Sequence, residues 1–524
     1  MKNAIIALAV LLFFCNCKKS LKPEEIDLSS QLSKPSPFPF RDYLGVNAFE
    51  WDFVEEKQAN IISNKKIEVI RSFGAIRHYL DWERMESNQG KYTFNPTHAG
   101  GAYYDIMYQK LKEENIDVLV CLKNVPKWFV EGYPENERGG DNTPVPFNAA
   151  KNDPTSYLAQ AQMAFQFAAR YGSNQNINPS LVSIDTSKRW TGDDVNQLKI
   201  GMGLIKYIEC NNEPDKWWAG KKAQQTAEEY AANLSAFYDG HKGKLGKNAG
   251  VKTADKNIMV VMGGLGDPKP EFVAQMIEWC KKNRGFKPDG KVDLCFDVIN
   301  YHIYANDAFV NSGKATSGIA PELSELGEMA DNFIKMRDKN APDIPVWVTE
   351  TGYDVGKTPQ SAISIGSKSS LITQADWNLR TSLLYARHGI ARCMFYMLDD
   401  AGGVNNPVQY SSSGFVNENG TKRPSADYML QAKKLLGNYF YIKTLSNQPI
   451  VDLYKLNNKE IYVLTLPSQK GLKVTYELDL GTSKQAIIHS LQIGKQQMLA
   501  KTTDTKDGKL KIEVSETPIF IEKI

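Results

Sequence analysis

The sequence predicts an α/β protein, a (β/α)8 barrel with a C-terminal antiparallel β-sandwich. Eight short apolar runs recur between about residues 41 and 437, and most are followed by a longer amphipathic stretch. Continuous apolar runs are typical of parallel strands that are covered on both faces, and eight strand-helix repeats indicate a barrel. After about residue 437 the runs become short and alternating, which indicates antiparallel strands.

The eight barrel strands are assigned from the apolar runs, each of which ends near polar or turn-forming residues. In chain order they cover residues 43–49, 67–73, 116–122, 204–210, 258–264, 295–304, 345–350 and 391–398.

Helix boundaries are readable between several of these strands. A helix over 155–171 follows Pro154, which is favoured at a first helical position. Thr226 and Glu229 form a capping box ahead of the next clear helix. A helix over 374–390 leads into the eighth strand.

The barrel is expected to span residues 41–437 and the sandwich 438–524. We expect the sandwich to be a structural cap, with a carbohydrate-binding module as the alternative. Its predicted strands cover residues 450–456, 459–466, 472–480, 485–493, 509–514 and 518–524.

The N-terminus reads as an export signal over residues 1–17, followed by a Pro-rich linker over 18–40. The apolar run from Ala4 to Phe14 is too short for a membrane-spanning helix, which needs about 20 residues. The cysteines that follow resemble the lipidation site of bacterial lipoproteins, with Cys15 or Cys17 as the acylated residue. We therefore expect a secreted protein or a periplasmic or outer-membrane lipoprotein of a Gram-negative bacterium, whose only membrane contact is this lipid anchor.

Charge and cysteine content exclude several classes of function. With 63 Lys and Arg against 60 Asp and Glu, the chain lacks the basic excess that nucleic-acid binding requires. No CxxC pair or HExxH segment occurs, so neither a metal nor another cofactor is expected. The cysteines beyond the signal are predicted to be free and buried, at positions 121, 210, 280, 295 and 393.

Two glutamates stand where a barrel places its reactive groups, at the carboxyl ends of strands. Glu213 follows the fourth predicted strand in "YIECNNEPDKWW", and Glu350 ends the seventh in "PVWVTE". Either residue alone has an ordinary explanation, as a helix N-terminal acid or a solvated rim carboxylate. Together, on strands four and seven, they predict a pair of facing carboxyl groups.

The chain resembles the clan A retaining glycoside hydrolases over residues 40–437 and the trailing sandwich. The resemblance rests on "NNEPDKW", "VTETGY" and "IRHYLDWERMESNQGKYTF", and lipoprotein members of families 5 and 39 are nearest in character. It implies that Glu213 is the acid/base, that Glu350 is the nucleophile, and that Asn212 binds the sugar 2-hydroxyl. Retention requires the two carboxyl groups to lie about 5–5.5 Å apart, with Glu213 protonated and Glu350 ionised.

The resemblance also implies residues that support the pair. Arg71 is expected to hydrogen-bond Glu350, with Arg77 as the competing candidate and a surface salt bridge as the ordinary role. His302 and Tyr304, in "NYHIY" at the end of strand six, match a His-x-Tyr pair that contacts the nucleophile.

Aromatic residues near the strand ends are expected to stack on sugar rings, with core packing as the alternative. The candidates are Trp82, Trp128, Trp217 and Trp218. The eighth strand departs from the family, because "FYMLDD" lacks the tryptophan that usually forms the floor of the catalytic subsite. Tyr396 is the candidate substitute.

The sequence thus predicts a monomeric retaining glycoside hydrolase that acts on a β-linked polysaccharide or oligosaccharide, with endo action favoured. Two alternatives stay open. One is an exo-β-glycosidase similar to xylosidases, and the other is a surface glycan-binding lipoprotein without turnover.

Overall fold

The computed structural model describes residues 35–56, 58–94, 103–188, 195–306 and 318–524. The predicted signal, the lipidation candidates Cys15 and Cys17, and the linker up to residue 34 lie outside these residues. Within the described ranges, every helix is too short or too polar to cross a membrane.

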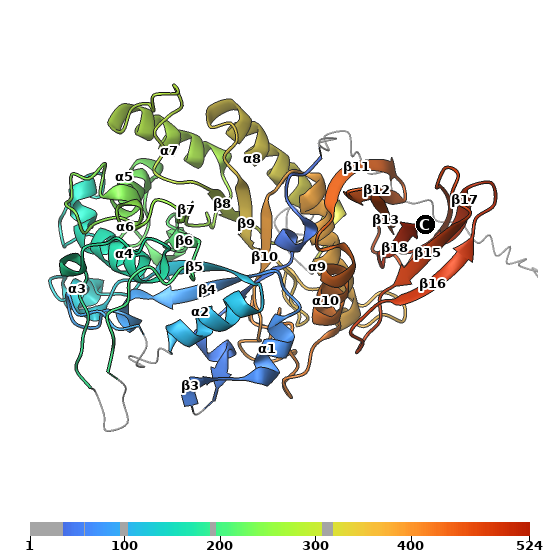
Figure 1. The fold of residues 1–524 in the computed structure, drawn as a ribbon, viewed down its shortest axis with the longest axis horizontal. Coiled ribbons are helices and arrows are strands. Elements are labelled where there is room, and N and C mark those ends of the chain that lie inside the picture. Colours follow the sequence, from blue (N-terminus) through green and yellow to red (C-terminus); the bar gives the residue numbers. More distant parts are fainter. Residues whose placement is uncertain (1–34, 57, 95–102, 189–194, 307–317) are drawn as a thin grey trace, which may run out of the picture.

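Eight parallel strands form a nearly closed barrel, which confirms the predicted fold class (Figure 1). Around the barrel the order is β7-β6-β5-β4-β1-β10-β9-β8, and bridges Val261–Val298 and Leu265–Tyr301 join β7 to β8. The strands are β1 (Gly45–Ala48), β4 (Ala75–Asp81), β5 (Asp117–Lys123), β6 (Tyr207–Cys210), β7 (Met259–Met262), β8 (Ile299–His302), β9 (Val346–Glu350) and β10 (Arg392–Phe395).

Seven of the eight predicted strands coincide with these elements, and the second does not. Residues 67–73 fall mostly in helix α1 (Asn64–Ile70), whereas the second barrel strand is β4. Ile67 and Ile70 are buried at helical spacing, so one face of α1 packs on the barrel. The search for apolar runs missed β4 because this strand carries Arg77 and His78, two fully buried polar residues that interrupt its apolar run.

Helices surround the barrel (Figure 1). The predicted capping box is confirmed at α5, where Thr226 N donates to Glu229 Oε2 at 2.9 Å and Glu229 N donates to Thr226 Oγ1 at 3.3 Å. Besides α1, the α-helices are α2 (Tyr104–Glu113), α3 (Lys127–Val130), α4 (Leu158–Tyr171), α5 (Ala227–Asp239), α6 (Val251–Ala254), α7 (Pro270–Asn283), α8 (Leu326–Asn340), α9 (Ser370–Arg387) and α10 (Pro424–Leu436). Short 3-10 helices are η1 (Phe40–Tyr43), η2 (Glu50–Asp52), η3 (Trp82–Arg84), η4 (Glu135–Glu137), η5 (Pro154–Tyr157), η6 (Pro179–Leu181), η7 (Trp217–Ala219) and η8 (Pro321–Leu323).

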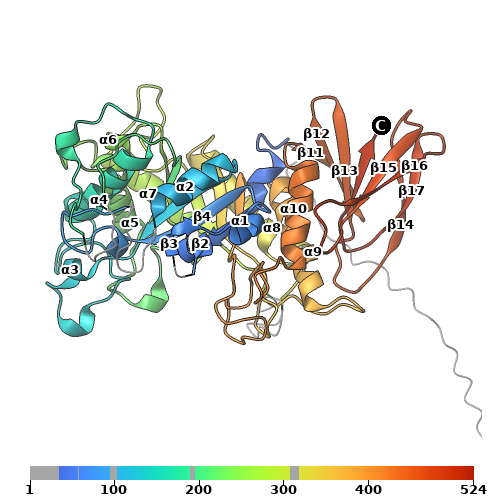
Figure 2. The same cartoon turned by 60° about the horizontal axis from the view of Figure 1, so that its bottom comes forward.

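The C-terminal strands form antiparallel sheets beside α9 and α10 (Figure 2). One sheet has the order β11-β12-β13-β18-β15-β16, and β14 pairs with β17 in a second sheet that shares an apolar cluster with the first. All six predicted strands are found, together with β11 and the exposed, polar β16. The elements are β11 (Phe440–Asn447), β12 (Ile450–Leu456), β13 (Lys459–Thr465), β14 (Val474–Asp479), β15 (Gln485–Ser490), β16 (Leu499–Asp504), β17 (Lys509–Val514) and β18 (Ile519–Lys523); a small hairpin, β2 (Val54–Glu55) and β3 (Gln58–Ile62), lies beside the barrel.

The C-terminal sheets are joined to the barrel by main-chain and ionic contacts. Ser36 N donates to Tyr441 O at 2.9 Å, so the end of the predicted linker is tied to β11. Arg387 of α9 lies 2.8 Å from Asp452 of β12, and both side chains are buried. The five cysteines beyond the signal are free and buried, as predicted.

Asp452→Ala is expected to lower the free energy of unfolding by no more than about 3–5 kcal/mol, because it removes the nearer acid of the buried Arg387 cation and leaves only Glu322, at 3.8 Å. Chemical denaturation measures the change. The matched control is Glu513→Ala, which removes an exposed partner of Lys473 and should not shift the unfolding midpoint. Equal midpoints for the two variants would contradict the role of Asp452 at this junction.

Candidate active site

Glu213 and Glu350 meet at the carboxyl ends of the barrel strands. Glu350 is the last residue of β9, and Glu213 lies three residues after β6 in a tight turn, where Asn211 and Glu213 have positive φ values of 68° and 47°. Such values are uncommon for residues other than glycine and are concentrated at functional sites. Carboxylate oxygens of the two glutamates lie within 4.8 Å of each other, and His302 is in the same group. This separation suits the carboxyl pair of a retaining mechanism.

Three side chains hold the carboxylate of Glu350. Arg77 Nη1 lies 2.8 Å from Oε1, the Tyr79 hydroxyl donates to the same oxygen, and the Tyr304 hydroxyl donates to Oε2 at 3.0 Å. Burial alone would raise the pKa of Glu350, but the positive charges of His302 and Arg77 and the bond from Tyr79 hold that pKa below its ordinary value. Glu350 is therefore ionised at pH values where an exposed glutamate already takes up a proton.

His302 lies between the two acids. Its Nδ1 is 3.0 Å from Glu213 Oε1 and 3.4 Å from Glu350 Oε1, and its Nε2 is 3.1 Å from Thr349 Oγ1. Burial alone would lower the pKa of His302, but the Glu350 and Glu213 carboxyl groups hold it above its ordinary value. The side chain thus links the two glutamates and fixes where they face.

The pair opens into a cleft of about 810 Å³. Of the predicted ligand-binding residues, the cleft is lined by Asn212, His302, Tyr304, Trp217, Trp218 and Tyr396. The exposed fractions of Trp217 and Trp218 are 64% and 51%, which leaves both rings open to a ligand. Arg77 Nη2 donates to Asn212 Oδ1 at 2.8 Å and so orients the Asn212 amide beside Glu213.

Arg71 does not reach the site, and the competing candidate Arg77 does. Arg71 follows helix α1 and forms a half-exposed ion pair with Glu114 at 2.7 Å and another with Glu68 at 3.1 Å. The prediction of Arg71 was wrong because it depended on a strand at 67–73, and the true second strand begins at Ala75.

Trp82 and Trp128 are not among the residues that line the cleft. Trp82 is 1% exposed and packs edge-on against Trp128. Both indole N–H groups bond to Glu86, at 2.5 Å to its carboxylate and 2.7 Å to its carbonyl oxygen. These contacts show that the two tryptophans pack against each other and against Glu86 outside the cleft lining. The prediction that they stack on sugar rings was therefore wrong.

Several lining residues were not predicted. Tyr79 bonds Glu350, Phe49 stacks on Tyr79 with ring centroids 5.3 Å apart, and Tyr410 packs on Tyr304 with centroids 4.7 Å apart. The signal that could have identified Tyr79 is its spacing of two residues from Arg77, which places both side chains on one face of a strand. Phe49 ends the predicted strand 43–49 and stands one residue beyond β1, whereas Tyr410 lies in a loop, where the sequence carries no such periodicity.

Among the described residues, one group of acids and histidines has the spacing of a metal site, and it consists of Glu213, His302 and Glu350. These residues already neutralise one another, because His302 faces both carboxyl groups. The Arg77 guanidinium, 2.8 Å from Glu350, would also repel a bound cation. The arrangement suits acid/base chemistry between side chains better than metal ligation.

Glycines after β7 make room for this arrangement. A Cβ on Gly264 would lie 2.0 Å from His302 Nε2, so no side chain fits there unless His302 moves. Gly266 has the same role beside Trp218, because its Cβ would lie 2.8 Å from that ring.

If Glu213 and Glu350 act as the resemblance implies, Gly264→Ala is expected to lower kcat/KM about 100-fold, because it displaces His302 from both glutamates and small misplacements of catalytic groups have effects of this size. Initial rates on a cleaved glycan measure the change. The control is Gly132→Ala, since a Cβ at Gly132 meets no atom within 4 Å. Unchanged kinetics in Gly264→Ala would show that the position of His302 has no effect on turnover.

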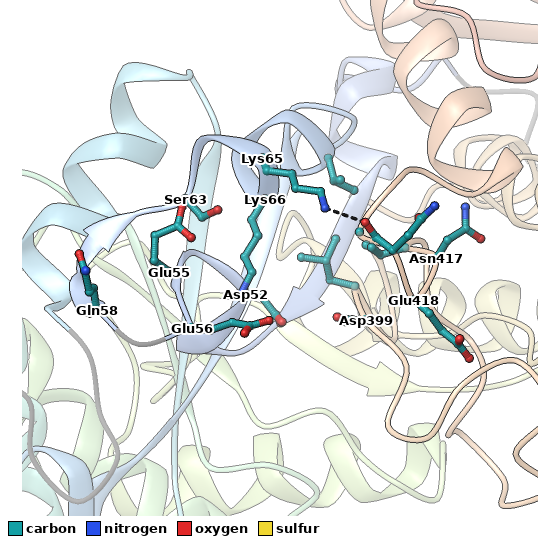
Figure 3. Close-up of a pocket in the computed structure, with 15 residues that line it drawn as sticks. Asp52, Glu55, Glu56, Gln58, Ser63, Lys65, Lys66, Asp399, Asn417 and Glu418 are labelled. Atoms are coloured by element: carbon teal, nitrogen blue, oxygen red, sulfur yellow. Dashed lines mark hydrogen bonds between the residues drawn. The ribbon is translucent and has the colours of Figure 1, made fainter.

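A second cavity, of about 770 Å³, lies between the β2–β3 hairpin, α1 and the loop after β10 (Figure 3). Burial raises the pKa of one lining residue, Asp52, to about 7. The lining is polar, includes no aromatic ring, and is partly closed by Lys65, whose Nζ donates to Asn419 O at 2.6 Å. It therefore lacks the stacking surface that the cleft around Glu213 provides.

Comparisons with solved structures place this fold among glycoside hydrolases. A family 39 glycoside hydrolase from the gut symbiont Bacteroides cellulosilyticus WH2 aligns with 93% of this chain and 81% of its own, at 19% identity and a TM-score of 0.60. A family 30 endoxylanase from Clostridium papyrosolvens C71 aligns with 94% of this chain and 97% of its own, at 11% identity and a TM-score of 0.53.

A family 51 α-L-arabinofuranosidase from Bifidobacterium longum is similar over 93% of this chain and 97% of its own, at 12% identity and a TM-score of 0.53. No protein-family model and no curated protein matches the sequence. At such identities the likeness establishes the fold alone: the chain has the barrel-and-sheet architecture of glycoside hydrolases of families 30, 39 and 51.

Proposed function

We propose that the protein is a retaining glycoside hydrolase that acts on a β-linked polysaccharide or oligosaccharide. The observation that carries the proposal is the facing pair of Glu213 and Glu350, with carboxylate oxygens within 4.8 Å, at the base of an aromatic-lined cleft. Export and lipid attachment at Cys15 or Cys17 belong to the same proposal, as does a monomeric state.

In the first step, Glu350 attacks the anomeric carbon while Glu213 gives its proton to the leaving glycosidic oxygen. The bond to the leaving group breaks and a covalent glycosyl ester on Glu350 forms. In the second step, Glu213 removes a proton from water, and the resulting hydroxide oxygen displaces Glu350 from the anomeric carbon. Both carboxyl groups return to their starting state, and the product keeps its configuration.

The supporting contacts fit these steps. Arg77 and Tyr79 keep Glu350 ionised, Tyr304 orients it, and His302 holds Glu213. Asn212, oriented by Arg77, is placed to bind a sugar hydroxyl next to the reacting carbon. A Cβ on Gly266 would touch both Trp218 and Glu213, so Trp218 adjoins the acid and serves as a platform for the leaving group.

The residues from 18 onward, incubated with β-glucans, galactans, mannans, xylans and algal glycans, test the proposal. Product lengths separate endo from exo action, and proton NMR of the first product gives the anomeric configuration. Cleavage with retained configuration supports the proposal, whereas inverted product would refute the double displacement. Binding of a glycan without cleavage would favour the alternative of a glycan-binding protein.

A further inference from the structure

A third buried carboxylate, Glu209, lies below the two facing acids. It belongs to β6, four residues before Glu213, and is fully buried. Its oxygens accept from Arg77 Nε at 2.6 Å, Arg77 Nη2 at 2.9 Å, Gly264 N at 3.0 Å and Asn300 Nδ2 at 3.1 Å. Glu209 does not line the cleft, so any effect on the reaction must pass through these partners.

The first partner is Arg77, whose charge is shared between two acids. Nε and Nη2 face Glu209, while Nη1 faces Glu350 at 2.8 Å. One cation thus lies between two buried carboxylates, and Glu209 takes the bidentate contact. The negative charge of Glu209 offsets part of the positive field of Arg77 at Glu350, so its loss would stabilise the Glu350 anion and make it a weaker nucleophile.

The second partner is Asn300, which begins a hydrogen-bond chain to Glu213. Asn300 Nδ2 has Glu209, Met262 O and Thr349 Oγ1 within reach, at 3.1, 3.2 and 2.8 Å. The amide carries two hydrogens for these three acceptors, and neither the carboxylate nor the carbonyl can donate in return. The Thr349 hydroxyl then donates to Asn300 Oδ1 at 3.0 Å.

This direction fixes the protonation of His302. Since Thr349 Oγ1 has given its hydrogen to Asn300, it accepts from His302 Nε2–H at 3.1 Å. Nδ1 is then the nitrogen that faces Glu213 Oε1, at 3.0 Å. The chain from Glu209 therefore ends at the acid/base.

We propose that Glu209 is a positioning residue that acts on both catalytic acids, through Arg77 on Glu350 and through Asn300, Thr349 and His302 on Glu213. The inference rests on the proposed function and assigns no contact with substrate to Glu209.

The test is the pH dependence of kcat/KM for Glu209→Gln in the full protein on a cleaved glycan. The titratable and charged groups around Glu350 are Arg77 and Tyr79 from β4, Cys121 from β5, Glu213 from the loop after β6, His302 and Tyr304 from β8 and its end, and Tyr396 and Tyr410 after β10. The variant lacks the negative charge that offsets Arg77, so Glu350 stays ionised to lower pH. We expect the acid limb to move to lower pH and kcat to fall about 10- to 100-fold, with KM within about twofold.

The matched control is Glu322→Gln, which breaks another buried glutamate-arginine pair, with Arg380, and which does not line the cleft. Both variants should lose stability, but only Glu209→Gln should change the pH profile of the folded fraction. Identical profiles for the two variants, or a wild-type kcat and acid limb in Glu209→Gln, would overturn the inference.

If Glu209→Gln does not fold, Glu209→Asp provides a second test. It keeps the negative charge but shortens the side chain by one methylene group, which moves the charge away from Arg77 and Asn300. We expect the acid limb of its pH profile to lie between the position for the wild type and the lower pH expected for Glu209→Gln. Its kcat should also be reduced. An aspartate variant that matches the wild type in both measurements would also overturn the inference. Lack of any hydrolysis by the wild type would instead refute the proposed function, and the inference with it.

Discussion

Glu350→Gly is expected to lower glycan hydrolysis by about four orders of magnitude or more, because it removes the group that forms the covalent intermediate in the proposed mechanism. The variant loses one partner of Arg77, Tyr79 and Tyr304 but leaves the cleft walls in place. Rates on the glycan cleaved by the wild type measure the loss. A thermal unfolding curve shows that the variant is folded.

Added azide should restore part of the activity of Glu350→Gly, because the small anion fits the space that the side chain leaves and attacks the anomeric carbon. The product is then a glycosyl azide of inverted configuration, which mass spectrometry and NMR identify. Full activity in the variant without azide would remove Glu350 from the mechanism.

Glu213→Gln should show the second-largest effect, and that effect should depend on the leaving group. Loss of the proton donor is expected to slow cleavage of natural glycosidic bonds about 100- to 10,000-fold. A nitrophenyl glycoside of the same sugar needs no protonation, so its first step should keep most of its rate and release a burst of nitrophenol. Pre-steady-state absorbance measures this burst.

The matched control for Glu213 is Glu228→Gln, on the exposed face of α5, which should leave both substrates unaffected. The Gln variant also keeps a hydrogen-bonding group beside His302, so its effect isolates the proton. An equal loss on the glycan and on the nitrophenyl glycoside would indicate a binding role for Glu213 rather than general acid catalysis.

Most of the barrel was predictable because its strands are short and mainly apolar, and β5 and β9 show the pattern clearly. The second strand was misplaced because the interior of the barrel is polar at that point. Arg77 is fully buried among acids from other strands, and no local pattern distinguishes it from an exposed arginine such as Arg71.

The aromatic residues show the same limit. All four candidate tryptophans follow barrel strands, yet Trp217 and Trp218 are exposed in the cleft while Trp82 is buried. Trp82 and Trp128 differ from the other two because both of their indole groups donate hydrogen bonds to Glu86. A sequence shows that a tryptophan lies near a strand end, but its burial depends on which loop folds over it.

The sequence by itself determined the barrel, the antiparallel C-terminal strands, and the strand ends that carry Glu213 and Glu350. Only the tertiary structure decided that these acids face each other, that Arg77 rather than Arg71 serves Glu350, and that Glu209 shares the charge of Arg77. The reason is physical: apolar periodicity is set by neighbours a few residues apart, whereas these contacts join side chains from different strands. Their distances follow from the register and closure of the whole barrel.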